Sequence, residues 1–148
     1  MRLLQTGITG FDSTTQVPAA QLKRAVYAAA QAAGAKVGEV RPAAGVTPNF
    51  HQVDVDFGSR TLVVLCNRHV PVVAFADQVD GMEIERFLGA PVDFAATMVA
   101  SGFDVGDVAE LNRRVTSGDL KMLSPTEQDQ AKYWKPERVG DIIFNWWD

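Results

Sequence analysis

The sequence predicts an α+β fold in which an antiparallel β-meander is covered by an N-terminal helix and by a helical C-terminal half. Three observations lead to this prediction. An Ala-rich stretch with an apolar stripe lies near the N-terminus, alternating apolar and polar residues follow it, and the last third of the chain carries helix-start signals. A chain of 148 residues is long enough for one core, so residues 1–148 are expected to form a single domain.

The N-terminal third is expected to contain one long helix between two short strands. The apolar run Leu3–Ile8 predicts a first strand. Pro18 suits the first position of a helix, where its missing N–H costs nothing, and Gly34 is a natural helix terminator. A helix is therefore expected over residues 18–33, followed by a strand over residues 36–40.

The clearest strand pattern follows, where apolar residues alternate with Gln and Asp up to the hairpin signal Gly58-Ser59. Counting back across this two-residue turn places His51 opposite Cys66. The run from Leu62 to Leu65 is apolar on both faces, which is typical of a central strand covered on both sides. The expected strands of this meander are residues 51–57, 60–66 and 70–76.

The C-terminal half contains signals for four helices. Val92, Ala95, Ala96 and Val99 share one face of an expected helix over residues 91–100. Asp107 and Ser124 are followed three residues later by glutamate, as in capping boxes, and the helix after Asp107 is expected to end at about Thr116. The last helix is expected over residues 136–148, and its apolar stripe comprises Val139, Ile142, Ile143, Trp146 and Trp147.

Charge and composition exclude several classes of function. The net charge is -4, and an acidic chain repels a phosphate backbone, so no nucleic-acid partner is expected. No apolar run approaches the roughly 20 residues that span a bilayer, so no membrane partner is expected either. The single cysteine cannot form an intramolecular disulfide, which fits a reducing compartment and predicts a cytoplasmic protein.

His51, Cys66 and His69 are the residues with chemistry that could serve catalysis. A histidine opposite a cysteine could act as base and nucleophile, and the three together could ligate a metal. The sequence favours a small buried thiol beside a strand-end imidazole, because free cysteine is among the most buried residue types. Metal-ligand spacings, phosphate loops and nucleophile elbows are all missing from the sequence. No catalytic residue, metal or cofactor is therefore assigned.

Three groups of residues are candidates for binding a partner. Asp54 and Asp56 point outward from one strand face. The turn Asn67-Arg68-His69 carries a cation, a titratable ring and an amide, which can bind an anion or a carboxylate. The aromatic C-terminus adds tryptophans beside an arginine, a combination common at the centres of protein interfaces. The candidates of this third group are Trp134, Arg138 and Trp147.

The C-terminal segment YWKPERVGDIIFNWWD, from Tyr133 to Asp148, resembles the terminal motif of small uncharacterised bacterial proteins. Some proteins of this kind are immunity proteins that neutralise toxins by direct binding. The resemblance implies a non-catalytic protein-binding module, acting as an immunity or inhibitor protein against a basic toxin. The acidic residues that would face such a toxin are Asp54, Asp56, Asp77, Asp80, Glu83 and Glu85.

Two other interpretations remain open. A small enzyme could use a cleft near His51, Cys66 and His69. A structural homodimer could associate through the last helix.

Overall fold

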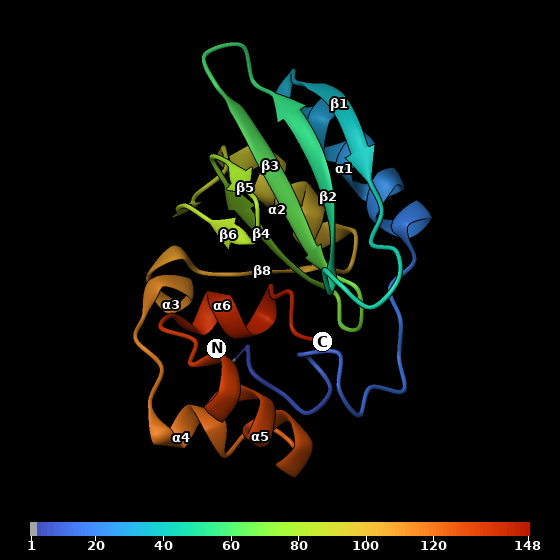
Figure 1. Cartoon of the computed structure of the whole chain (residues 1–148). Coiled ribbons are helices and arrows are strands. Elements are labelled where there is room, and N and C mark those ends of the chain that lie inside the picture. The colour runs from blue at the N-terminus through green and yellow to red at the C-terminus, as the bar shows by residue number, and fades with distance from the viewer. Residues whose placement is uncertain (1–2) are drawn as a thin grey trace.

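In the computed structural model, which describes residues 3–148, two helices cover one face of a six-stranded sheet, and several short helices pack against the lower end of its other face (Figure 1). The strands follow the order β1-β2-β3-β4-β7, each antiparallel to its neighbour, and β8 pairs in parallel with β4. This architecture confirms the predicted α+β class. The strands are β1 (Lys36–Arg41), β2 (Phe50–Asp56), β3 (Thr61–Asn67), β4 (Val72–Ala76), β7 (Phe87–Leu88) and β8 (Asp104–Val105).

The pairing of β2 with β3 confirms the predicted hairpin register. His51 lies opposite Cys66, and Val53 lies opposite Val64. Side chains of β3 alternate between two separate cores: Leu62, Val64 and Cys66 belong to one, and Val63 and Leu65 to the other. The strand is therefore apolar on both sides because each side is covered.

Helices α1 (Ala19–Ala33) and α2 (Val92–Ala100) cover one face of the sheet. The bounds of α1 agree with the prediction, and the helix ends where Gly34 adopts a left-handed conformation with φ of 67°. The predicted face of α2 is wrong. Val92 and Val99 are 81% and 57% exposed, whereas Phe94 and Met98 are fully buried. The larger apolar area of Phe and Met outweighs that of the Val and Ala stripe.

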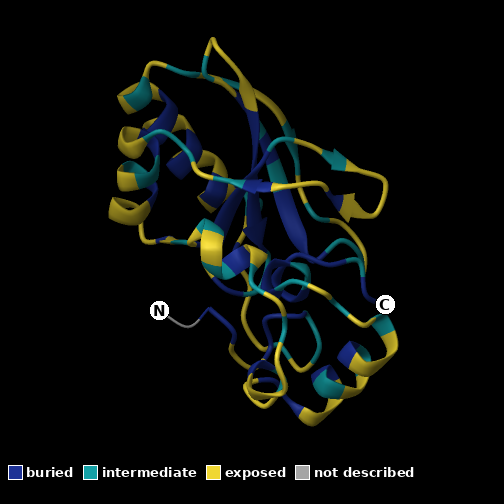
Figure 2. Ribbon diagram, turned by 90° about the vertical axis from the view of Figure 1, so that its left-hand side faces the viewer, coloured by how far each residue is buried: buried dark blue, intermediate teal, exposed yellow. Residues whose placement is uncertain are grey.

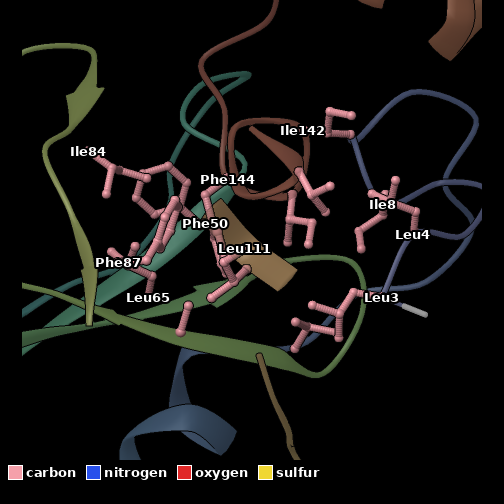
Figure 3. Close-up of a cluster of buried hydrophobic side chains, with 14 of the residues drawn as sticks. Leu3, Leu4, Ile8, Phe50, Leu65, Ile84, Phe87, Leu111, Ile142 and Phe144 are labelled. Carbon is pink, nitrogen blue, oxygen red and sulfur yellow. The ribbon is translucent and has the colours of Figure 1, made fainter. Parts of the chain in front are cut away.

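The other face is covered by the N-terminal segment and by four short helices, which form the core drawn in Figure 3. The expected strand at Leu3–Ile8 is wrong: Leu3, Leu4 and Ile8 are buried in this core, but the backbone forms turns. The Glu127 carboxylate holds that backbone, since it accepts hydrogen bonds from Gly7 N (2.9 Å) and Thr9 N (3.0 Å). The four helices are α3 (Val108–Asn112), α4 (Ser117–Leu120), α5 (Pro125–Trp134) and α6 (Val139–Ile143).

Two of the predicted helix starts are confirmed. Ser124 forms the expected capping box with Glu127 at the start of α5, and Asp107 accepts a hydrogen bond from Glu110 N at the start of α3. However, α3 ends at Asn112 rather than Thr116. The following residues run extended and pair with the chain before α6, where Val115 N donates to Glu137 O at 3.0 Å.

The last helix is much shorter than the predicted 136–148. It ends at Ile143, and Phe144 is extended with φ of -120° and ψ of 100°. Residues Asn145 and Asn49 exchange hydrogen bonds, from Asn145 N to Asn49 Oδ1 (2.8 Å) and from Asn49 N to Asn145 O (3.0 Å). These contacts replace helical hydrogen bonds and hold the residues after α6 against Asn49, next to the start of β2.

The chain between β4 and β7 forms a separate hairpin of β5 (Val79–Asp80) and β6 (Glu83–Ile84). Ile84 at its base is buried, and its tip is exposed (Figure 2). The hairpin forms one wall of the groove described below. Within residues 3–148, no helix has the length and apolar character needed to cross a bilayer.

Candidate binding groove

A groove of about 660 Å³ separates the β5–β6 hairpin from the C-terminal part of the chain. This volume lies in the range of about 300–1,000 Å³ that is usual for ligand sites. Three segments line it: residues 82–85 of the hairpin, residues 134–138 between α5 and α6, and residues 141–147. The lining side chains are those of Met82, Glu83, Ile84, Glu85, Trp134, Lys135, Pro136, Glu137, Arg138, Asp141, Phe144, Asn145, Trp146 and Trp147.

Apolar side chains line both walls of the groove. Met82 at the hairpin tip is 62% exposed. Trp134 is half-buried, and its indole N–H donates to Gln130 Oε1 at 3.1 Å, which fixes the ring. Trp146 is also half-buried and packs edge-on against Phe50, with ring centroids 5.1 Å apart. The groove therefore combines rigid aromatic rings with one adaptable thioether.

Arg138 joins the two walls of the groove. Its guanidinium makes two hydrogen bonds to the Asp141 carboxylate, at 3.0 and 2.6 Å. It also lies 4.9 Å from the centre of the Phe87 ring and donates to Ile84 O at 2.8 Å. Asp141 neutralises the charge of Arg138, and the remaining contacts hold the hairpin against the start of α6. Arg138 thus fixes the position of the β5–β6 hairpin relative to α6, and with it the shape of the groove.

The remaining charge in the groove is acidic. Once Arg138 and Asp141 are counted as a pair, the lining contains the carboxylates of Glu83, Glu85 and Glu137 against the ammonium of Lys135. All four of these side chains are exposed, and none forms an ion pair within residues 3–148. An acidic rim around aromatic rings favours a cationic ligand.

The structure brings together the third predicted group of binding residues. Trp134, Arg138 and Trp147 all line the groove, as do Glu83 and Glu85 of the expected acidic face. Trp147 is only 7% exposed, because the chain turns back after α6, so its ring supports the groove rather than projecting from it. Sequence reasoning missed Met82, Lys135 and Trp146 as groove residues. Their only signal was an apolar residue next to a turn and the clustering of aromatic residues.

Asp54 and Asp56 lie on β2, outside this groove, and both already have partners. Asp54 makes a bidentate pair with Arg41, with distances of 2.9 and 2.6 Å. Asp56 accepts a hydrogen bond from Gly58 N at 2.7 Å and so supports the hairpin turn. The expected single acidic face is therefore divided between β2 and the β5–β6 hairpin.

Asn67 is buried and cannot meet a partner, which corrects its prediction as a binding residue. Its amide nitrogen donates to Ile8 O (2.8 Å) and Ile143 O (2.7 Å), and its oxygen accepts from His69 N (2.8 Å) and Val70 N (3.1 Å). A buried amide with every hydrogen-bonding group satisfied stabilises a unique packing. Asn67 therefore joins β3 to both the N-terminal segment and α6.

Arg68 and His69 are half-buried and line a second hollow of about 250 Å³. Trp147 lies in the lining of both this hollow and the groove. The other residues of the hollow are Thr9, Gly10, Phe11, Gln16, Gly45 and Val46.

His51 and Cys66 are adjacent on paired strands, but neither is available for catalysis in this structure. Burial raises the pKa of the Cys66 thiol and keeps it protonated, and the residue is fully buried. Both ring nitrogens of His51 are engaged: Ala43 N donates to Nδ1 at 2.9 Å, and Nε2 contacts Val17 O at 2.8 Å. Burial also lowers the pKa of His51. Within residues 3–148, no three His, Cys, Asp or Glu side chains are arranged to hold a metal ion.

Comparisons with protein-family models, with curated proteins and with solved structures found no match for this chain.

Proposed function

We propose that this chain is a non-catalytic protein-binding module whose groove receives a basic segment of a partner protein. The observation that carries this proposal is the composition of the groove, in which carboxylates that form no ion pair within residues 3–148 surround half-buried tryptophans. Lysine and arginine side chains bind such a surface in two ways, through attraction to the carboxylates and through contact with the aromatic faces.

The surroundings of the groove extend the surface available to a partner. Tyr133, next to Trp134, is 76% exposed, and the two rings pack edge-on with centroids 5.2 Å apart. Met82 supplies an exposed apolar group on the opposite wall. Tyrosine, tryptophan and methionine are enriched at the cores of protein interfaces, and a polar rim normally surrounds them.

The groove is held in shape before any partner arrives. Arg138 connects the hairpin to α6, and the Trp134 ring is fixed by Gln130. A preformed surface loses little conformational freedom on binding, so more of the contact energy appears as affinity.

An immunity or inhibitor protein directed against a basic toxin is the specific form of this function that we propose. The net charge of -4 supports it, because opposite overall charges steer two proteins together. The protonated, buried Cys66 fits a cytoplasmic protein of this kind.

The test is capture of a partner from a lysate of the native host by wild-type protein and by two charge-reversed variants. Glu83→Lys/Glu85→Lys changes the groove, whereas Asp93→Lys/Asp104→Lys makes the same change in net charge at exposed positions that do not line it. We expect a basic protein to be retained in stoichiometric amount by the wild type and by the second variant, and to be lost by the first. Absence of any stoichiometric partner, or equal loss with both variants, would overturn the proposal.

A homodimer through the last helix is less well supported, because Val139, Ile142 and Ile143 are already buried within one chain. Self-association would have to use another surface, such as the groove. Light scattering of the wild type and of Trp134→Ala would distinguish the two cases: a monomeric wild type leaves the groove free for a different protein.

A further inference from the structure

We infer that the hollow beside Arg68 and His69 binds a small oxyanion, carried by a phosphate or a carboxylate. This site is separate from the acidic groove and does not depend on the function proposed for it. The charge in the hollow has the opposite sign: among residues 3–148, Arg68 is the one formally charged residue in its lining, and no aspartate or glutamate lines it.

Arg68 has most of its hydrogen-bonding capacity available. Its Nη1 donates to Gly45 O at 2.6 Å, which directs the guanidinium along the edge of the hollow. Within residues 3–148 it forms no other side-chain hydrogen bond and no ion pair. A guanidinium has five N–H donors in a planar fork, and this fork matches the oxygens of a carboxylate or phosphate.

His69 supplies a second donor. Its Nδ1 lies 3.3 Å from Thr15 O, so Nδ1 carries the proton of the neutral ring. Nε2 then faces Gly10, where a Cβ atom would lie only 3.2 Å away, and Gly10 is itself part of the lining. The backbone of His69 is held on both sides, by Asn67 Oδ1 at 2.8 Å and by Thr15 Oγ1 at 2.6 Å. When Nε2 takes up a proton, it becomes an N–H donor on the Gly10 side of the same hollow that Arg68 lines.

Before any anion binds, the surroundings of His69 keep its ring neutral. Arg68 and His51 lower the pKa of His69, and Glu127 raises it, while burial is the largest effect and lowers it. The Glu127 carboxylate is already occupied by hydrogen bonds from Gly7 N, Thr9 N and Ser124 N. An oxyanion bound to Arg68 would bring a negative charge into the hollow, and this charge would favour the protonated form of His69 and raise its pKa.

The size of the hollow limits the ligand. A volume of about 250 Å³ lies below the usual range of about 300–1,000 Å³ for drug-sized ligands. Phe11 and Trp147 form apolar parts of the wall, and Gln16 adds an amide. The site therefore fits inorganic phosphate, a terminal phosphate group or a small carboxylic acid.

The experiment uses the two histidines as reporters, since His51 and His69 are the only ones in the chain. The imidazole Cε1–H signals are followed by NMR while sodium phosphate, sodium acetate or sodium chloride is added at matched ionic strength. Assignment comes from His69→Gln. We expect phosphate, acetate or both to shift the His69 signal saturably and to raise its pKa, while His51, whose nitrogens are both engaged, stays unchanged.

Arg68→Gln removes the charge and keeps a polar side chain, and it should weaken oxyanion binding by roughly tenfold or more. Arg24→Gln, an exposed position on α1, is the control with the same change in net charge and should bind as the wild type does. Saturation by phosphate alone identifies a phosphate ligand, and saturation by acetate as well identifies a carboxylate. Equal effects of all three salts, or undiminished binding by Arg68→Gln, would overturn the inference.

Discussion

Replacement of Gly140 by alanine tests the packing between α6 and the core that contains Val63 and Leu65. A Cβ atom on Gly140 would lie 2.4 Å from Phe87 Cε2, 2.5 Å from Phe87 Cζ and 3.1 Å from Leu111 O. Carbon atoms in contact normally lie about 3.5–4.0 Å apart, so the Phe87 ring would have to move by roughly an ångström. That ring is 2% exposed and lies against the Arg138 guanidinium, so it has little space to move into.

Two effects of opposite sign decide the outcome. Alanine is favoured over glycine inside a helix by about 1 kcal/mol. Overpacking a well-packed core costs about 1–3 kcal/mol, and more when rigid atoms are involved. Two ring atoms and a backbone oxygen obstruct the new methyl group, so we expect the upper end of this range and a net loss of about 2 kcal/mol. For a chain of this size that corresponds to a fall in Tm of about 4–8 °C.

Urea and thermal denaturation followed by circular dichroism would measure this loss. Gly118→Ala in α4 is the matched control, because the nearest atom to its Cβ is Thr116 Oγ1 at 3.7 Å, and this variant should be neutral or slightly more stable. The double variant Gly140→Ala/Phe87→Leu should recover part of the loss by replacing the obstructing ring. A Gly140→Ala protein as stable as the wild type would refute the described packing of Phe87 against α6.

Three further predictions concern buried polar groups. Glu127→Gln should lower the free energy of unfolding by about 2–4 kcal/mol, because an amide NH2 would face backbone donors that now bind a carboxylate; a urea titration showing an unchanged midpoint would contradict the anchoring role. Burial lowers the pKa of His51, so the unfolded chain binds a proton first and the free energy of unfolding should fall as the pH drops below about 6.5. The fall should be smaller, but not absent, in His51→Gln, because the lowered pKa of His69 acts in the same direction. Urea midpoints between pH 7.5 and 5 measure the slope, and a rise in stability on acidification would contradict the prediction. The Cys66 thiol should resist iodoacetamide in native protein and react only after denaturation, and rapid native alkylation followed by mass spectrometry would show that the thiol is accessible.

Local patterns predicted the elements whose determinants are close in sequence. The β2–β3 register follows from a two-residue turn and the alternation beside it, so His51 could be placed opposite Cys66 in advance. The start of α5 follows from Ser124 and Glu127, which lie three residues apart and complete a capping box on their own.

The errors occur where distant contacts override local preference. The apolar pattern of residues 139–147 suits a longer helix, but hydrogen bonds from Asn49, almost a hundred positions earlier, end it after Ile143. Leu3–Ile8 has the composition of a strand, yet Glu127 binds its backbone in a turn. The groove combines three segments that no local pattern connects, so Met82 could not be placed beside Trp134 from the sequence. The aromatic character of the C-terminus could be recognised, but not the β5–β6 hairpin that forms the other wall of the groove.

The contacts of Glu127 and Asn145 also constrain how the chain folds as it is synthesised. Thr9 bonds to Glu127 across 118 positions and to Asn145 across 136. While the nascent chain leaves the ribosome, the hairpin of β2 and β3 and its cover by α1 can form early from neighbouring residues. The apolar side chains of the N-terminal segment must wait until residues 127–145 have been made. That face of the sheet is therefore the part most exposed to chaperones or aggregation before those residues emerge.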